Sequence, residues 1–187
     1  EYNSYVSNYD GKLVAIDPDT ETFQANIEDL ERKITPKTKA LIINNPNNPT
    51  GVVYSEETIK KVAAILDAKQ KEYGTEIFIV SDEPYRELAY DGVEVPYITK
   101  YYNNTIVGYS FSKSLSLPGE RIGYLVIPDE VDDAEQMKTA AAIATRVLGF
   151  VNAPSLMQRA VARCIDAKCD VDSYNRNREA LYNGLVK

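Results

Sequence analysis

Residues 40–80 read ALIINNPNNPTGVVYSEETIKKVAAILDAKQKEYGTEIFIV, and this stretch decides the fold class. It begins and ends with short apolar runs, Ala40–Ile43 and Glu76–Val80, which predict buried strands. Ser55 is the expected N-cap of a helix between them. The apolar residues of that helix recur at the i, i+3, i+4, i+7 spacing of an amphipathic face: Ile59, Val62, Ala63 and Leu66. Two buried strands joined by an amphipathic helix predict neighbouring parallel strands.

The same pattern extends on both sides of this unit. Upstream, Ile27–Lys33 has helical spacing, with Asn26 as the expected N-cap. Downstream, the apolar runs Thr105–Gly108 and Gly123–Ile127 predict two further buried strands. The link between these two holds Pro118-Gly119 and is barely long enough for a parallel crossover, so we expect the last strand to run antiparallel. The prediction is a three-layer α/β domain with a mainly parallel sheet, one antiparallel strand, and helices on both faces.

The chain becomes helical after Pro128. The alanine-rich stretch Val131–Val147 predicts one helix, and Ser155–Ala167 predicts a second after a break at Asn152-Ala153-Pro154. Ser173–Lys187 resumes helical spacing. The predicted inner face of the second helix consists of residues four apart: Leu156, Ala160 and Cys164.

The composition excludes several classes of function. The chain carries 21 Lys and Arg against 28 Asp and Glu, a net charge of -7, which speaks against nucleic acid or an anionic membrane as a partner. It contains no histidine, so Ser-His and Cys-His catalysis and histidine metal sites are excluded within this chain. Its two cysteines match neither a zinc pair nor a redox motif, and we expect no metal. Chemistry here must use lysine, carboxylates, tyrosine or a cofactor.

The ends of the chain and its hydropathy bear on location and completeness. No stretch approaches the ~20 consecutive apolar residues of a membrane span, and the N-terminus lacks a secretory pattern. We therefore expect a cytoplasmic protein. The chain starts at Glu1 without a methionine and ends at Lys187 within a predicted helix, so we expect it to be a piece of a longer protein.

Polar motifs follow three of the predicted strands, where open parallel sheets bind ligands. The first motif is Asn44–Gly51, NNPNNPTG, whose two Asn-Pro steps predict a stiff turn that can aim an amide into a cleft. The second is Ser81–Tyr85, SDEPY, in which an acid and a phenol could form one site. Taken alone, each of these two motifs is an ordinary turn.

The third motif is Ser110–Gly123, SFSKSLSLPGERIG. A lysine in a non-helical segment near a strand end can lose its solvation and become nucleophilic, although an isolated Lys113 would be an ordinary surface charge. Ser-x-x-Lys also occurs in penicillin-binding enzymes and β-lactamases. Those enzymes need a Lys-Thr-Gly element as well, and the sequence has none. Chance is a poor explanation for all three motifs on successive strand ends.

Together, NNPNNPTG, SDEPYREL and SFSKSLSLPGERIG, in this order and spacing, resemble the class I/II aminotransferases of fold type I, the aspartate aminotransferase-like family. The likeness extends over nearly the whole chain. It implies that Lys113 forms a Schiff base with pyridoxal 5'-phosphate and moves a proton between substrate and cofactor. It implies that Asp82 binds the pyridine nitrogen and keeps it protonated, so that the ring acts as an electron sink.

The resemblance also assigns the other cofactor contacts. Asn48 and Tyr85 would hydrogen-bond the phenolic oxygen of the cofactor, and Ser110 and Arg121 would hold its phosphate. Residues 1–150 would be the central part of the cofactor-binding large domain, and residues 151–187 would lead toward a small domain outside this chain. The implied partners are amino-acid and 2-oxo-acid substrates and a second subunit in a homodimer.

Three alternatives remain open at this point. A C–S β-lyase of the same fold would use the same Lys113 for β-elimination. A non-catalytic sensing domain of a transcriptional regulator would share the fold, although the chain has no basic DNA-binding segment. A structural α/β domain would bind no cofactor. Because the carboxylate-binding arginine, the ring-stacking aromatic and the upstream phosphate loop of the family lie outside this chain, we expect the chain alone to be inactive.

Overall fold

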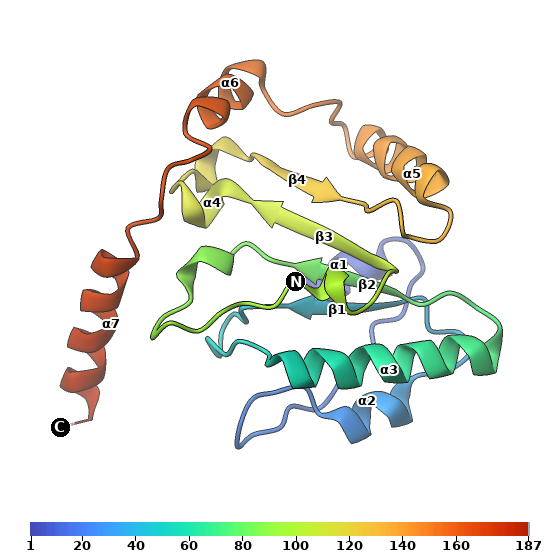
Figure 1. The fold of residues 1–187 in the computed structure, drawn as a ribbon. Coiled ribbons are helices and arrows are strands. Elements are labelled where there is room, and N and C mark those ends of the chain that lie inside the picture. Colours follow the sequence, from blue (N-terminus) through green and yellow to red (C-terminus); the bar gives the residue numbers. More distant parts are fainter. Residues whose placement is uncertain (187) are drawn as a thin grey trace.

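A computed structural model describes residues 1–186 and contains a four-stranded sheet in the order β1-β2-β3-β4 (Figure 1). The strands are β1 (Ala40–Asn44), β2 (Phe78–Asp82), β3 (Thr105–Ser110) and β4 (Gly123–Val126). β1, β2 and β3 run parallel, and β4 pairs antiparallel with β3. In Figure 1 α2 and α3 lie beneath β1, and α5 and α6 lie above β4. The predicted fold class is confirmed.

The helices α2 (Ile27–Lys33) and α3 (Glu56–Tyr73) form as the sequence predicts. The Asn26 side chain accepts a hydrogen bond from the backbone N–H of Asp29, and the Ser55 side chain accepts one from Thr58. The end of α3 is set by Gly74, which adopts the left-handed conformation that glycine tolerates.

The remaining helices are shorter or lie toward the C-terminus. α1 (Tyr2–Ser7) was not predicted. α5 begins three residues later than expected, because Asp133 has a left-handed backbone with φ 53. Besides α1, α2 and α3, the described chain contains the helices α4 (Phe111–Ser114), α5 (Ala134–Val147), α6 (Ser155–Arg163) and α7 (Val171–Leu185). It also contains three 3-10 turns, η1 (Arg86–Leu88), η2 (Ile98–Lys100) and η3 (Pro118–Glu120).

The main core joins α2, α3 and η2 to strands β1 and β2. All four apolar residues predicted for the inner face of α3 are buried. They pack with Leu30 of α2, Ile43 of β1 and Ile79 of β2, and Leu66 and Ile79 have no exposed surface. Burial of side chains of this size contributes about 1.5–3 kcal/mol each, so this core fixes the position of the sheet on which the candidate site is built.

Two predictions about burial are wrong. β4 was expected to be buried, but every residue of it is exposed, because it is an edge strand and, unlike the other edge strand β1, it contributes no residue to either core cluster. All three expected inner residues of the α6 region, Leu156, Ala160 and Cys164, are exposed. Instead Val161 is buried with Phe111 and Ile122, and Met157 packs against this second cluster. The α6 helix therefore covers α4 and the start of β4, with a face different from the predicted one.

The α7 helix extends away from the sheet (Figure 1). Its Arg178 guanidinium donates two hydrogen bonds, each 2.8 Å long, to the Asp91 carboxylate. The helix begins at Val171, and its predicted end at Lys187 lies outside the described residues. No helix within residues 1–186 is both long and apolar enough to cross a membrane.

Candidate active site at the carboxyl ends of three parallel strands

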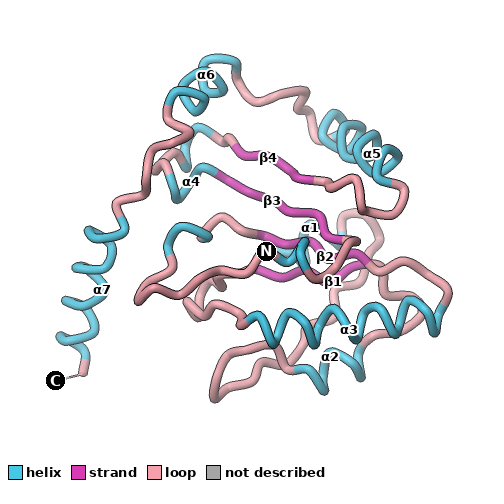
Figure 2. The backbone as a smooth tube through the Cα atoms, viewed as in Figure 1, coloured by secondary structure: helices cyan, strands magenta, loops and turns pink. Residues whose placement is uncertain are grey.

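The three parallel strands end at the same edge of the sheet, and the loops that follow them leave from that edge (Figure 2). Asn44 lies directly beside Asp82 in the register of β1 and β2, and Asp82 lies beside Gly108 of β3. The sequence motifs that follow the separate strands therefore begin next to one another. The main core holds β1 through Ile43 and β2 through Ile79, so the loops that follow these two strands start from a packed base.

Asp82 is the last residue of β2 and is half-buried. Its Oδ2 accepts a hydrogen bond from the Tyr2 hydroxyl at 2.6 Å and one from the Asn44 side-chain amide at 3.2 Å. The same Asn44 amide also donates to the Asp82 backbone carbonyl at 3.1 Å. The carboxylate is thus held at one oxygen by groups from two other elements.

The loop after β1 brings Asn48 to Tyr85. The Asn44 side-chain oxygen accepts a hydrogen bond from the Asn48 backbone N–H at 2.8 Å, which folds the loop back on the strand end. The exposed Asn48 amide then donates to the Tyr85 hydroxyl at 3.0 Å. An amide and a phenol from different strand ends are therefore paired, as two donors that could address one ligand oxygen.

Lys113 lies in a helix, which corrects the prediction of a non-helical segment. The one-turn helix α4 forms because the Ser110 side chain caps it by accepting a hydrogen bond from the Ser112 backbone N–H. Lys113 is half-buried, and its Nζ lies 5.6 Å from the centre of the Tyr85 ring. The amine therefore joins the Asn48–Tyr85 pair.

Ser110 and Arg121 line one hollow of about 210 Å³. Ser112, whose hydroxyl lies 2.6 Å from that of Ser110, lines it as well. Arg121 is exposed, and its Nη1 donates to the Pro118 carbonyl at 2.9 Å. Two hydroxyls and a guanidinium in one hollow make a donor set that suits an anion such as phosphate.

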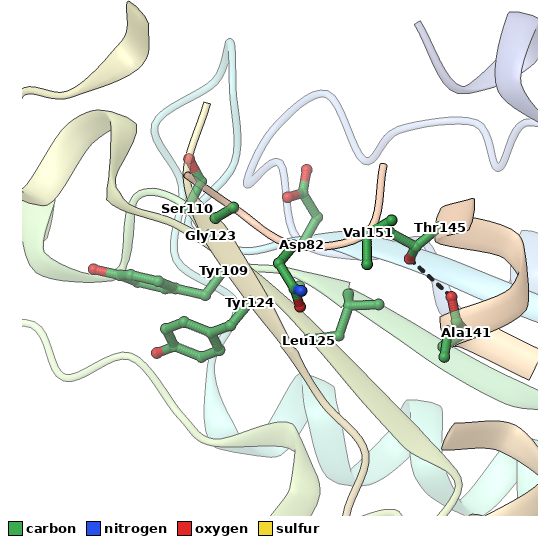
Figure 3. A pocket seen from close by; sticks show the side chains of 13 residues that line it. Asp82, Tyr109, Ser110, Gly123, Tyr124, Leu125, Ala141, Thr145 and Val151 are labelled. Carbon is green, nitrogen blue, oxygen red and sulfur yellow. Dashed lines mark hydrogen bonds between the residues drawn. The ribbon is translucent and has the colours of Figure 1, made fainter. Parts of the chain in front are cut away.

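A larger hollow of about 570 Å³ connects Asp82 with Ser110. In Figure 3 the Asp82 carboxylate and the Ser110 hydroxyl point to the same side of the sheet, while the rings of Tyr109 and Tyr124 point away from it. Those two rings stack on each other, with centroids 5.0 Å apart. Residues of α5, including Thr145, line the far wall. The hollow is therefore open on the side where the polar groups of β2 and β3 gather.

These contacts connect the predicted residues in three sets. Asn48, Tyr85 and Lys113 are joined by direct contacts, whereas Asp82 meets Ser110, and Ser110 meets Arg121, only across shared hollows. Within residues 1–186, Lys113 and Asp82 form neither a hydrogen bond nor an ion pair with each other. No group of three or more Cys, Asp or Glu within residues 1–186 could hold a metal ion.

The prediction from sequence did not include Asn44, Ser112 or Tyr2. Asn44 could have been found, because an amide at the end of β1 must lie beside whatever ends the neighbouring strand. Ser112 sits within the quoted lysine motif and could have been added for its hydroxyl. Nothing in the sequence pointed to Tyr2, which reaches Asp82 across 80 positions.

Comparison with known proteins gives the same family throughout. A family model described as aminotransferase class I and II matches residues 1–187. A probable aspartate aminotransferase of Methanocaldococcus jannaschii is 33% identical over 191 residues, covering 98% of this chain and 48% of that protein. A probable aspartate/prephenate aminotransferase of Aquifex aeolicus is 42% identical over 112 residues, covering 58% of this chain and 27% of that protein.

Solved structures agree with these relatives. An aminotransferase from Eubacterium rectale superposes with a TM-score of 0.96 at 53% identity, covering 100% of this chain and 47% of that one. A mutant of the Thermus thermophilus aspartate aminotransferase gives a TM-score of 0.81 at 28% identity, covering 100% and 50%. The chain spans about half or less of the length of these relatives. With one family model matching it from end to end, the chain belongs to the aminotransferase class I and II family.

Proposed function

We propose that this chain is the cofactor-binding part of a pyridoxal 5'-phosphate-dependent aminotransferase, which transfers an amino group between an amino acid and a 2-oxo acid. One observation carries the proposal: the ends of three adjacent parallel strands bring an amine, a carboxylate, a phenol–amide pair and a hydroxyl–guanidinium hollow to one edge of the sheet. Each group has a counterpart on a small aromatic phosphate that carries an aldehyde.

The phosphate would lie in the hollow of Ser110, Ser112 and Arg121. The planar guanidinium of Arg121 can donate to two phosphate oxygens, and the paired hydroxyls supply further donors. Anchoring the phosphate at this end fixes where the aldehyde end lies relative to Lys113.

Asp82 would receive the pyridine nitrogen on its open carboxylate oxygen. A carboxylate at this place keeps the nitrogen protonated. When bound, the cofactor supplies an electron sink for the carbanion that forms at the substrate α-carbon. Asn48 and Tyr85 would donate to the phenolic oxygen, and the hydrogen bond from the Asn48 amide to the Tyr85 hydroxyl holds the two side chains next to each other.

Lys113 would hold the cofactor covalently through Nζ and, once released by the substrate amine, would move a proton to and from the substrate α-carbon. Its place over the Tyr85 ring keeps the amine on the phenol side of the site. The proposal extends to the organisation of the full protein: residues 1–150 form the central part of the large domain, residues 151–187 lead toward a small domain, and two subunits form a homodimer.

The test is attachment of the cofactor to one lysine. Full-length protein is mixed with pyridoxal 5'-phosphate, reduced with borohydride and digested, and the labelled peptide is identified by mass spectrometry. We expect the label on Lys113 and its loss, with loss of transaminase activity, in Lys113→Ala. Lys100→Ala is the matched control, because the Lys100 amine also lies over a tyrosine ring, 5.5 Å from the centre of Tyr97. Equal trapping in both variants would overturn the assignment.

A further inference from the structure

The contact between Tyr2 and Asp82 joins the first helix of the described chain to the end of β2. The Tyr2 hydroxyl donates to Asp82 Oδ2 at 2.6 Å, the shortest hydrogen bond to this carboxylate. Tyr2 belongs to none of the three sequence motifs, and its helix α1 contributes no buried residue to either core cluster. The position of this phenol therefore has no explanation in core packing.

Both donors to the carboxylate meet the same oxygen. Tyr2 and Asn44 each donate to Oδ2, and no donor within residues 1–186 meets Oδ1. An ionised carboxylate can accept hydrogen bonds at both oxygens. The arrangement thus restrains the rotation of the Asp82 side chain and leaves Oδ1 without a donor from the described chain, on a residue that lines the hollow shared with Ser110.

Tyr2 is suited to act as a permanent donor. Burial, followed by the hydrogen bond to Asp82, raises the pKa of the Tyr2 phenol above its ordinary value of 10.0. The phenol therefore keeps its proton throughout the neutral range and stays available to donate it to Asp82.

We infer that Tyr2 is a positioning residue for the cofactor: its hydroxyl holds Asp82 by Oδ2 so that Oδ1 faces the protonated ring nitrogen. This inference rests on the proposed function. Without the phenol, Asn44 is the remaining side-chain donor at 3.2 Å, and the carboxylate can turn away from the ring. Tyr2 acts through Asp82 and touches neither substrate nor cofactor.

The experiment measures the protonation of the ring nitrogen directly. Full-length protein is loaded with pyridoxal 5'-phosphate that carries an isotope label at the ring nitrogen, and its NMR shift is recorded for wild type, Tyr2→Phe and Tyr5→Phe. For Tyr2→Phe we expect the signal to move toward that of the unprotonated ring, with about tenfold weaker cofactor binding, the size expected from the loss of about one hydrogen bond. Tyr5→Phe should match wild type, because Tyr5 lies on the same helix with 63% of its surface exposed.

The outcomes separate this inference from the proposed function. If Lys113 is trapped in Tyr2→Phe and the ring-nitrogen signal equals that of wild type, the inference is overturned and the proposed function stands. If wild type itself takes up no cofactor at Lys113, the proposed function fails and the inference fails with it. A structure of the loaded wild type gives an independent check that needs no variant: Tyr2 should remain on Oδ2, and a Tyr2 hydroxyl that has left Asp82 would also overturn the inference.

Discussion

Gly123 allows β4 to approach β3 closely. A Cβ at this position would lie 2.3 Å from the Tyr109 backbone oxygen, which cannot move aside without disturbing the strand. We expect Gly123→Ala to lower the free energy of unfolding by about 1–3 kcal/mol through this overlap, measured as a lower midpoint in urea. Gly184→Ala is the control, because its Cβ meets nothing within 4 Å and alanine favours the helix. Equal midpoints for wild type and Gly123→Ala would contradict the expectation.

Asp29 makes stability depend on pH. Hydrogen bonds from Lys33 and from the Asp17 backbone, with a further one from Arg32, hold the pKa of the Asp29 carboxyl well below its ordinary value of 3.8. Because the folded pKa is depressed, the contribution of Asp29 is complete above 3.8 and is lost as the pH falls below that value. Compared with Asp29→Asn, wild type should have the higher unfolding midpoint at neutral pH, and this difference should shrink in acid. A difference that stays constant in acid would show that the charge contributes nothing.

For single residues, the sequence was most informative where a polar side chain stands at the end of a predicted strand. Asp82 and Ser110 could be placed because each ends a strand of recognisable pattern. Arg121 and Lys113 could be placed only by their spacing within one motif, and the helix around Lys113 was missed because a single capped turn has no period to detect. Tyr2 could not be placed at all, since its contact depends on the tertiary fold.

A buried ion pair stiffens the segment that follows β2. Glu83, only 3% exposed, accepts hydrogen bonds from the Arg86 guanidinium at 2.7 Å and the Ser81 hydroxyl at 2.6 Å. Arg86 also donates to the carbonyl oxygens of Val95 and Pro96, which closes the loop. Glu83→Gln leaves the guanidinium without its counter-ion, so we expect the free energy of unfolding to fall by about 3–5 kcal/mol, measured by urea denaturation.

A solvent-exposed ion pair on α3 serves as the control for Glu83→Gln. Glu56 and Lys60 lie 2.6 Å apart on α3, and more than half of each side chain is exposed. Glu56→Gln should change the free energy of unfolding by only about 0.5 kcal/mol or less, because water screens the pair. If Glu56→Gln and Glu83→Gln lose similar amounts of unfolding free energy, burial does not strengthen the Glu83–Arg86 pair.

The elements with the strongest local signals were predicted most accurately. Helix α3 has a serine cap, a regular apolar face and a terminal glycine, and the structure shows all three. The exposure of β4 could not be predicted, since an apolar run looks the same in a central strand and in an outer one. The prediction of the inner face of α6 was wrong. The side of this short helix that becomes buried is set by the cluster around Phe111, and that cluster is assembled from distant parts of the chain.

At the scale of the whole molecule, Arg178 connects α7 to the body. Arg178 pairs with Asp91 and lies 4.7 Å from the centre of the Tyr90 ring. We expect Arg178→Ala to speed amide hydrogen exchange in α7 while exchange in the sheet stays unchanged, because the main core lies elsewhere. Arg176→Ala, an exposed site on the same helix, should leave exchange in α7 as in wild type. Equal protection of α7 in both variants would show that the Arg178 pair does not hold it.

The outer position of β4 also exposes a strand that can pair with another molecule. No described strand pairs with its free side, and Tyr124, Leu125 and Val126 are between 41% and 57% exposed. An apolar outer strand with unsatisfied backbone amides and carbonyls is a template for intermolecular β-pairing. We therefore expect this 187-residue chain alone to aggregate along β4, and a lysine introduced into that strand to oppose this pairing.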